Sequence, residues 1–134
     1  MADLTGQADS LQRNATRDVM LPVRRMDEVI GYYIGEEERT DPRASPALAD
    51  WANPPPALIM ASRSEILEDD ARALADALRR GGGSVQLELW RFLPHAWPIL
   101  AGRLPEADQA VERAGKFIAH HLASDAENTA DQAA

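Results

Sequence analysis

Residues 54–61 read PPPALIMA, and this stretch decides how the chain folds. Proline has no backbone N–H to donate, so the three prolines interrupt any regular element that precedes them. The apolar run at 57–61 is short, continuous and bounded by turn residues, which is typical of a buried strand in a parallel sheet. Such a strand needs sheet neighbours and cover on both of its faces.

A helix and a second strand are predicted directly after it. Apolar residues recur at helical spacing across 66–80, and the acidic residues 68–70 occupy the first turn, where the helix dipole favours negative charge. Three glycines at 81–83 end the helix, and residues 85–89 alternate between apolar and polar. Strand, helix and strand in this order predict a βαβ unit with parallel strands.

The elements outside this unit follow from proline and from apolar spacing. We expect a loop over 1–20, a helix from Pro22 to about Ile34, and proline-rich loop over 36–56. A last helix begins at Pro105 and extends to Leu122. The sequence thus predicts an α/β domain over 1–122 with the order helix, strand–helix–strand, helix, and a disordered tail over 123–134. Two strands alone make a poor sheet, so the sheet is expected to be incomplete.

Composition narrows the classes of function. The formal net charge of −8 comes with no basic patch, which argues against a nucleic-acid partner. The chain has no cysteine, so it has no disulfide or thiolate chemistry, which suits a reducing compartment. Residues 1–4 lack the pattern of a signal peptide, and the longest apolar stretch is too short to span a membrane. We expect a cytoplasmic protein without a membrane span.

Two residues occupy positions where α/β proteins place their chemistry. Glu65 follows the first strand and His95 lies in the loop after the second. Ligands of open α/β sheets bind at the carboxyl ends of the strands, so a carboxylate and an imidazole there fit a base and the group that orients it. From pattern alone, a helix-start acid and a structural loop histidine are the favoured interpretations, because most carboxylates and histidines in loops are structural or solvated.

Other candidates are weaker. His120 and His121 are adjacent on a helix, so their side chains point about 100° apart and do not chelate as an i, i+4 pair does. Asp69 and Asp70 lie close to Glu65, but nothing in their spacing requires a cation. No metal and no cofactor are expected.

Five blocks of sequence together resemble a known family. In order and spacing they are similar to the carboxyl-terminal portion of the hormone-sensitive-lipase-like bacterial esterases, which have the α/β-hydrolase fold. The blocks are DPRASP at 41–46, PPALI at 55–59, SEILEDDA at 64–71, PHAW at 94–97 and LPEA at 104–107.

The resemblance implies roles for the two candidate residues. It places the acid of a Ser-His-acid triad at Glu65 and the histidine at His95, whereas Asp69 and Asp70 match helix positions. It implies hydrolysis of short- to medium-chain acyl esters without a cofactor, once the missing amino-terminal portion is supplied from upstream or by a complementing chain. It also implies a homodimer as a possible assembly.

The chain also departs from the family. The nucleophile of the family sits in a Gly-x-Ser-x-Gly elbow and the oxyanion hole in a His-Gly-Gly loop. None of the six serines of this chain lies in such an elbow. The glycines at 81–83 do not form the oxyanion loop, because no histidine precedes them. Arg63 and Pro98 replace residues usual beside the acid and after the histidine. We therefore expect the isolated chain to be inactive, with a non-catalytic remnant or interaction module as the alternative.

Overall fold

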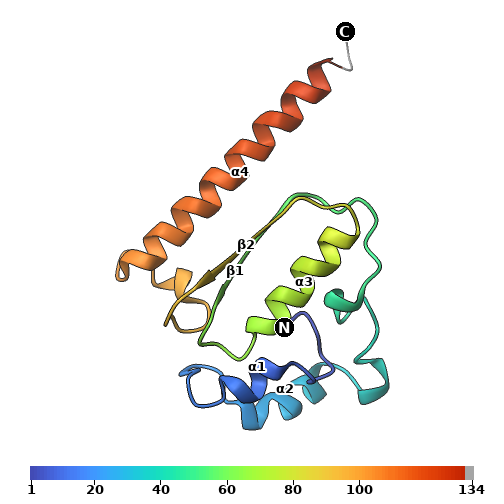
Figure 1. Ribbon diagram of the computed structural model, residues 1–134, viewed down its shortest axis with the longest axis vertical. Coiled ribbons are helices and arrows are strands. Elements are labelled where there is room, and N and C mark those ends of the chain that lie inside the picture. Colours follow the sequence, from blue (N-terminus) through green and yellow to red (C-terminus); the bar gives the residue numbers. More distant parts are fainter. Residues whose placement is uncertain (132–134) are drawn as a thin grey trace. The chain divides into compact units, whose positions relative to one another are not determined.

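The computed structural model describes residues 1–131, with side chains described as far as Ala123. It divides into two units, residues 1–95 and residues 96–134, and each is described here by itself (Figure 1).

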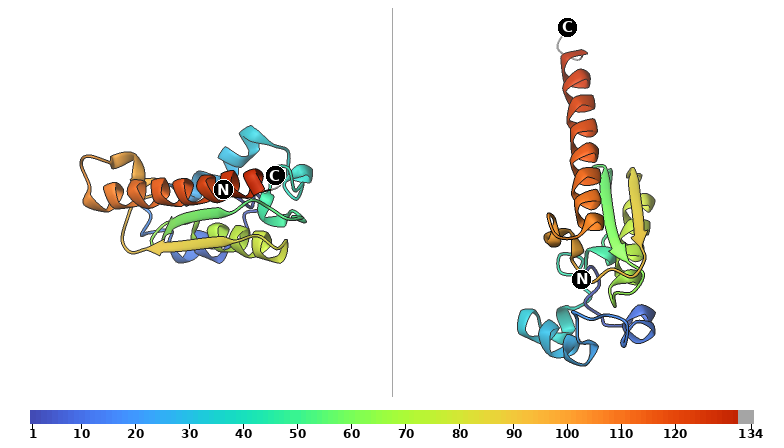
Figure 2. Two further views of the ribbon diagram at one scale, coloured as in Figure 1. Left: turned by 90° about the horizontal axis from the view of Figure 1, so that it is seen from above. Right: turned by 90° about the vertical axis from the view of Figure 1, so that its left-hand side faces the viewer.

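The first unit is built around a two-stranded parallel sheet. Strand β1 (Ala57–Ser62) pairs with β2 (Val85–Trp90), and the register sets Ala57 beside Val85 and Ser62 beside Trp90. Helix α3 (Glu68–Arg80) connects the strands and packs on one face of the sheet (Figures 1 and 2). The predicted βαβ unit is confirmed, because the two strands pair in parallel and a helix connects them. Parallel strands require such a crossover connection.

The glycines at 81–83 allow the close turn between α3 and β2. A Cβ on Gly81 would meet the Trp51 side chain at 2.7 Å, and one on Gly83 would meet Pro54 at 2.7 Å. Both contacts are shorter than real Cβ contacts allow, so the proline-rich loop passes directly over this turn. Trp51 is held there by its indole N–H, which donates to the Pro46 carbonyl at 3.0 Å.

The prediction for the first twenty residues was wrong, because they contain a helix. Helix α1 (Asp9–Arg13) is only five residues long, too short to show the periodicity from which a helix is predicted. It is held by tertiary contacts instead: Leu11 is buried against Ile66 and Leu67, directly before α3.

The helix predicted from Pro22 to about Ile34 is divided in two. A 3₁₀ turn, η1 (Val23–Arg25), precedes α2 (Met26–Tyr33). Two further 3₁₀ turns, η2 (Glu36–Glu38) and η3 (Pro46–Leu48), interrupt the proline-rich loop.

The second unit consists of a 3₁₀ turn and a long helix. Turn η4 (Trp97–Leu100), with Pro98 in its first turn, packs against α4 (Pro105–Asp131), whose Ala107 and Ala110 are buried. The helix is longer than the 105–122 predicted. The side chains of the predicted tail beyond Ala123 lie outside the described residues, so its disorder stays a prediction. No helix in the described part of the chain is both long and apolar enough for a membrane span.

Candidate active site

The structure brings Glu65 and His95 together. The Glu65 Oε2 atom lies 2.7 Å from the His95 Nδ1 atom, although the residues are thirty positions apart in the sequence. The parallel register causes this proximity, since β1 and β2 end at the same edge of the sheet and each is followed by one of the two loops.

Glu65 is a buried carboxylate with both oxygens engaged. The residue is 4% exposed, and its Oε1 atom accepts a hydrogen bond from the Ser62 backbone N–H at 2.9 Å. An ionised carboxylate only accepts hydrogen bonds, so it favours the histidine tautomer with its proton on Nδ1. That tautomer leaves the lone pair on Nε2, the arrangement that a general base requires.

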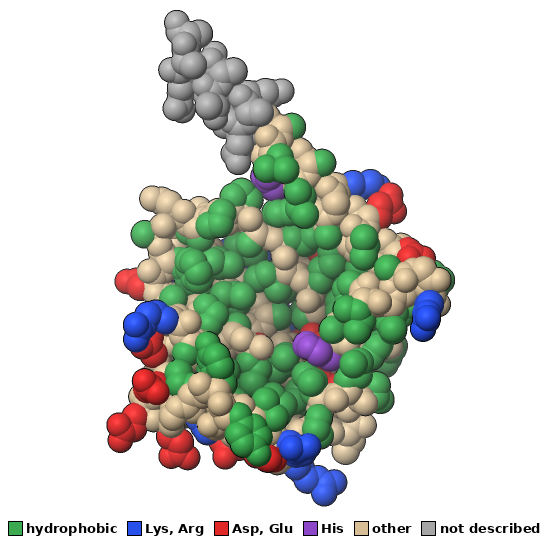
Figure 3. Space-filling view, turned by 180° about the vertical axis from the view of Figure 1, so that it is seen from behind, with side chains coloured by type: hydrophobic (Ala, Val, Ile, Leu, Met, Phe, Trp, Pro, Cys, Tyr) green, Lys and Arg blue, Asp and Glu red, His purple; other side chains and the backbone are tan. Residues whose placement is uncertain are grey.

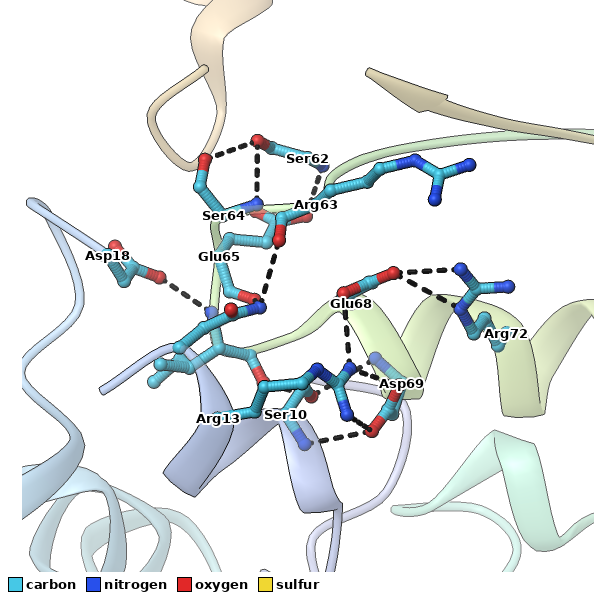
Figure 4. A network of polar contacts seen from close by, with 12 residues as sticks. Ser10, Arg13, Asp18, Ser62, Arg63, Ser64, Glu65, Glu68, Asp69 and Arg72 are labelled. Atoms are coloured by element: carbon cyan, nitrogen blue, oxygen red, sulfur yellow. Dashed lines mark hydrogen bonds and ion pairs between the residues drawn. The ribbon is translucent and has the colours of Figure 1, made fainter. Parts of the chain in front are cut away.

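Two serines, Ser62 and Ser64, join the Glu65 loop to the His95 loop, and Figure 4 shows the contacts between these two serines. Ser62 Oγ accepts hydrogen bonds from the backbone N–H groups of Ser64 and Leu93, both at 3.2 Å. The Ser64 hydroxyl donates to the Leu93 carbonyl at 3.0 Å and lies 2.8 Å from Ser62 Oγ. Because the Ser64 proton is committed to Leu93, the Ser62 hydroxyl is the donor between the two serines. These hydrogen bonds fix Leu93, two residues before the histidine.

The amino-terminal segment supports the same loop from its other side. Asn14 is fully buried and its side-chain amide donates to the carbonyls of Arg63 at 3.1 Å and Glu65 at 2.9 Å. The Asp18 carboxylate accepts from the Ile66 N–H at 2.9 Å, and the Ser10 hydroxyl donates to the Ile66 carbonyl at 2.6 Å. Sequence reasoning missed these supporting residues, since single polar residues in a presumed loop carry no pattern.

Asp69 and Asp70 are used elsewhere. Asp69 forms an ion pair with Arg13 at 2.8 Å, and the hydrogen bonds from that guanidinium lower the pKa of the Asp69 carboxyl (Figure 4). Asp70 is 3% exposed and accepts the backbone N–H of Ala2 at 2.7 Å. Burial raises the pKa of Asp70 above its usual value. Neither carboxylate has a recorded contact with His95.

Glu68 completes this polar network beside the site. Its carboxylate lies 3.1 Å from the Arg13 guanidinium and 2.8 Å from that of Arg72. Burial acts to raise the pKa of Glu68, but the hydrogen bonds from Arg72 and Arg13 outweigh it and the pKa is lowered. The network joins α1 to the first turn of α3 and so steadies the segment that carries Glu65.

His95 also lines an apolar pocket of about 420 Å³. The side chain is about one third exposed, and the rest of the lining is mostly hydrophobic. Hydrophobic side chains also gather over much of the face shown in Figure 3. The lining residues include Leu21, Met26, Ile30, Tyr33 and Leu67. An apolar pocket with a few polar groups at its wall is the usual form of a small-molecule site.

The described residues contain no group of three side chains that could hold a metal ion. The rings of His120 and His121 lie 5.0 Å apart in an edge-on arrangement, and the His121 ring also contacts Phe117 at 4.4 Å. These contacts belong to the surface of α4.

Comparison with known proteins places the chain in a family. Residues 1–99 match the family model described as alpha/beta hydrolase fold. The chain belongs to this fold family and, within it, to the hormone-sensitive-lipase-like group. The predicted fold class is thereby confirmed: the chain is an α/β-hydrolase portion with an incomplete sheet.

Three relatives show how much of that fold is present. The chain is 34% identical over 117 residues to an acetyl-hydrolase of Streptomyces hygroscopicus, covering 87% of this chain and 39% of that protein. It is 35% identical to an esterase of the bacterial hormone-sensitive lipase family, with a TM-score of 0.86, covering 90% of this chain and 41% of the other. An esterase/lipase from an uncultured bacterium gives 32% identity and a TM-score of 0.84, again covering 41% of that protein. The chain therefore spans about two fifths of the length of these relatives.

Proposed function

We propose that this chain supplies the acid and the base of a carboxylic ester hydrolase, with Glu65 and His95 as two members of a Ser-His-acid triad. The observation that carries the proposal is the 2.7 Å contact between Glu65 Oε2 and His95 Nδ1 at the wall of an apolar pocket. Glu65 would orient the imidazole and stabilise its protonated form. His95 would take the proton of the nucleophile and return it to the leaving alcohol.

The nucleophile has to come from outside the residues of this chain. None of its serines lies in a Gly-x-Ser-x-Gly elbow. The two serines beside the acid, Ser62 and Ser64, use their hydroxyls to hold the Leu93 backbone. A histidine and an acid without nucleophile and oxyanion hole lose most of the effect of a triad, because its members act as a unit. These 134 residues alone should therefore hydrolyse no ester, and they would act when the rest of the fold, with its nucleophile, is supplied.

The apolar pocket supports esters of short- to medium-chain acyl groups as substrates. Its hydrophobic lining suits the saturated chain of such an acyl group. The mechanism calls for no cofactor. The absence of cysteine suits a reducing cytoplasm, where we place the activity.

One observation favours a second candidate, an interaction module without catalysis. The sheet of the described residues has two strands, so β1 has one edge without a strand beside it. Such an edge presents free N–H and C=O groups to which a further strand adds, either from a complementing chain or from a second copy.

A complementation assay separates the two candidates. The chain is mixed with the separately expressed amino-terminal part of a family esterase that contains the Gly-x-Ser-x-Gly elbow, and hydrolysis of p-nitrophenyl butyrate is followed. We expect activity from the mixture and none from either part. Formation of a stable complex without hydrolysis, in the presence of an intact elbow serine, would favour the interaction module.

A further inference from the structure

Two arginines lie side by side where β1 and β2 end. The parallel register sets Ser62 beside Trp90, so the next residues of the two strands, Arg63 and Arg91, are neighbours. The Arg63 backbone N–H donates to the Trp90 carbonyl at 2.8 Å, which fixes the two chains at this point. Like charges placed opposite one another destabilise a strand pair. The pair therefore calls for a compensating negative charge.

Among the described residues, no acidic side chain forms an ion pair with the guanidinium of Arg63 or Arg91. The ion pairs there engage Arg13, Arg39, Arg43 and others, but none involves Arg63 or Arg91. Acidic residues outnumber basic ones by 22 to 14, so carboxylates are plentiful in this chain. Figure 4 shows the Arg63 side chain extending away from Glu65, the nearest acid in the sequence.

A third arginine lines the same cavity. Arg17 comes from the loop after α1, which is held by the Arg17 and Asp18 N–H groups donating to the Asn14 carbonyl at 2.9 Å. Arg17, Arg63 and Arg91 line a cavity of about 180 Å³ together with Ser64 and Phe92. This cavity has room for a tetrahedral oxyanion and part of the group that carries it. No ion pair is recorded for Arg17 among the described residues either.

Phe92 adds an apolar surface to this cavity. Its backbone is left-handed, with φ of +57°, a conformation that is a genuine outlier for a bulky residue. The side chain is 86% exposed, so no core packing accounts for the conformation. Backbone strain of this kind is found where a side chain has a binding role. The Ser64 hydroxyl donates its proton to the Leu93 carbonyl, so Ser64 lines the cavity without donating a hydrogen bond to a ligand.

We infer that Arg17, Arg63 and Arg91 form a binding site for a phosphate monoester whose organic group packs against Phe92. Guanidinium groups bind phosphate through paired, charge-assisted hydrogen bonds. Three guanidinium groups match the two negative charges of a phosphate monoester better than the single charge of a carboxylate. The inference does not depend on the proposed esterase function.

The test is isothermal titration of the 134-residue chain with phenyl phosphate, inorganic phosphate and benzoate at constant ionic strength. Phenyl phosphate should bind at one site and more tightly than the other two anions. Arg63→Gln and Arg91→Gln should each weaken this binding by tenfold or more, whereas Arg24→Gln, an exposed arginine outside the cavity, should leave it unchanged. Phe92→Ala should remove the preference for phenyl phosphate over inorganic phosphate.

Thermal unfolding shows whether each variant is folded and gives a second measure of ligand binding. Without ligand, Arg91→Gln should melt at or above the temperature of the parent chain, because one of two adjacent like charges is gone. Phenyl phosphate should raise the melting temperature of the parent chain and have little effect on that of the variant. Equal affinity in parent and variants, benzoate binding as tightly as phenyl phosphate, or a response that does not saturate would each overturn the inference.

Discussion

The carboxylate of Glu65 lies 2.7 Å from Nδ1 of His95, and no other acid of the described chain has a recorded contact with that imidazole. Asp69 and Asp70, four and five residues further on, are turned to Arg13 and to the amino-terminal backbone. Residues 65–70 contain four acids. Glu65 contacts the histidine, whereas Glu68, Asp69 and Asp70 bind arginines or backbone N–H groups that hold the fold.

This separation predicts the effects of substitution in the complemented esterase. Glu65→Gln and His95→Ala should each lower kcat by about 10³- to 10⁴-fold, since each removes one member of a unit. The measurement is steady-state hydrolysis of p-nitrophenyl butyrate. Asp69→Asn is the matched control and should keep kcat within a few fold. If it proves more harmful than Glu65→Gln, the acid has been assigned to the wrong residue.

Ser62 should prove a structural residue rather than a nucleophile. Ser62→Ala leaves the N–H groups of Ser64 and Leu93 without their acceptor in a fully buried position, which should lower the free energy of unfolding by about 1–3 kcal/mol. Urea denaturation gives this value. Ser84→Ala, at an exposed serine directly before β2, should change it by less than about 0.5 kcal/mol. A neutral Ser62→Ala would contradict the hydrogen bonds described.

Asp70 should make stability fall as the pH rises. Burial raises its pKa in the folded chain above 3.8, so the folded state binds more protons than the unfolded state between those two pKa values. The free energy of unfolding then decreases with rising pH across that interval. Asp70→Asn should show a weaker decrease in urea titrations from pH 4 upward. An unchanged pH dependence in the variant would show that Asp70 ionises as freely as in the unfolded chain.

Asp69 should act with the opposite sign. Arg13 lowers its pKa in the folded chain, so its stabilising contribution is present above the unfolded value of 3.8 and is lost as the pH falls through the lower folded value. Arg13→Gln should therefore cost about 0.5–1 kcal/mol at pH 7, a modest value because the guanidinium is nearly half exposed. The difference should disappear near pH 2. Arg24→Gln, at an exposed arginine without an ion pair among the described residues, should have no measurable effect at either pH.

Gly81 should tolerate no side chain. Its Cβ would meet Trp51 at 2.7 Å, and Gly81→Ala should destabilise the chain by about 1–3 kcal/mol through overpacking. Gly31, inside α2, has nothing within 4 Å of its Cβ position, so Gly31→Ala should be neutral or stabilising by up to about 1 kcal/mol. Thermal unfolding of the two variants tests both. Equal effects would mean that the loop at Trp51 gives way.

The βαβ unit was predictable from sequence because each of its elements carries its own period and its own end signal. The apolar run at 57–61 and the alternation at 85–89 fix the strands, and the parallel register then brings Glu65 to His95. Helix α1 was not predictable. It has five residues and depends on Leu11 and Ser10 meeting the start of α3, more than fifty positions later. The structural role of Ser62 and Ser64 was not predictable for the same reason, since their hydrogen bonds to the Leu93 backbone leave no pattern in the sequence.

The single helical crossover between β1 and β2 also has a consequence for folding kinetics. Glu65 and His95 meet when a loop of thirty residues closes, and the entropy of closure grows only slowly with loop length. Contacts at short sequence separation form early and fast compared with contacts between distant segments. The acid–base pair can therefore assemble as an early, local folding event, and Asn14 and Ser10 would reinforce it only when the more remote amino-terminal segment docks.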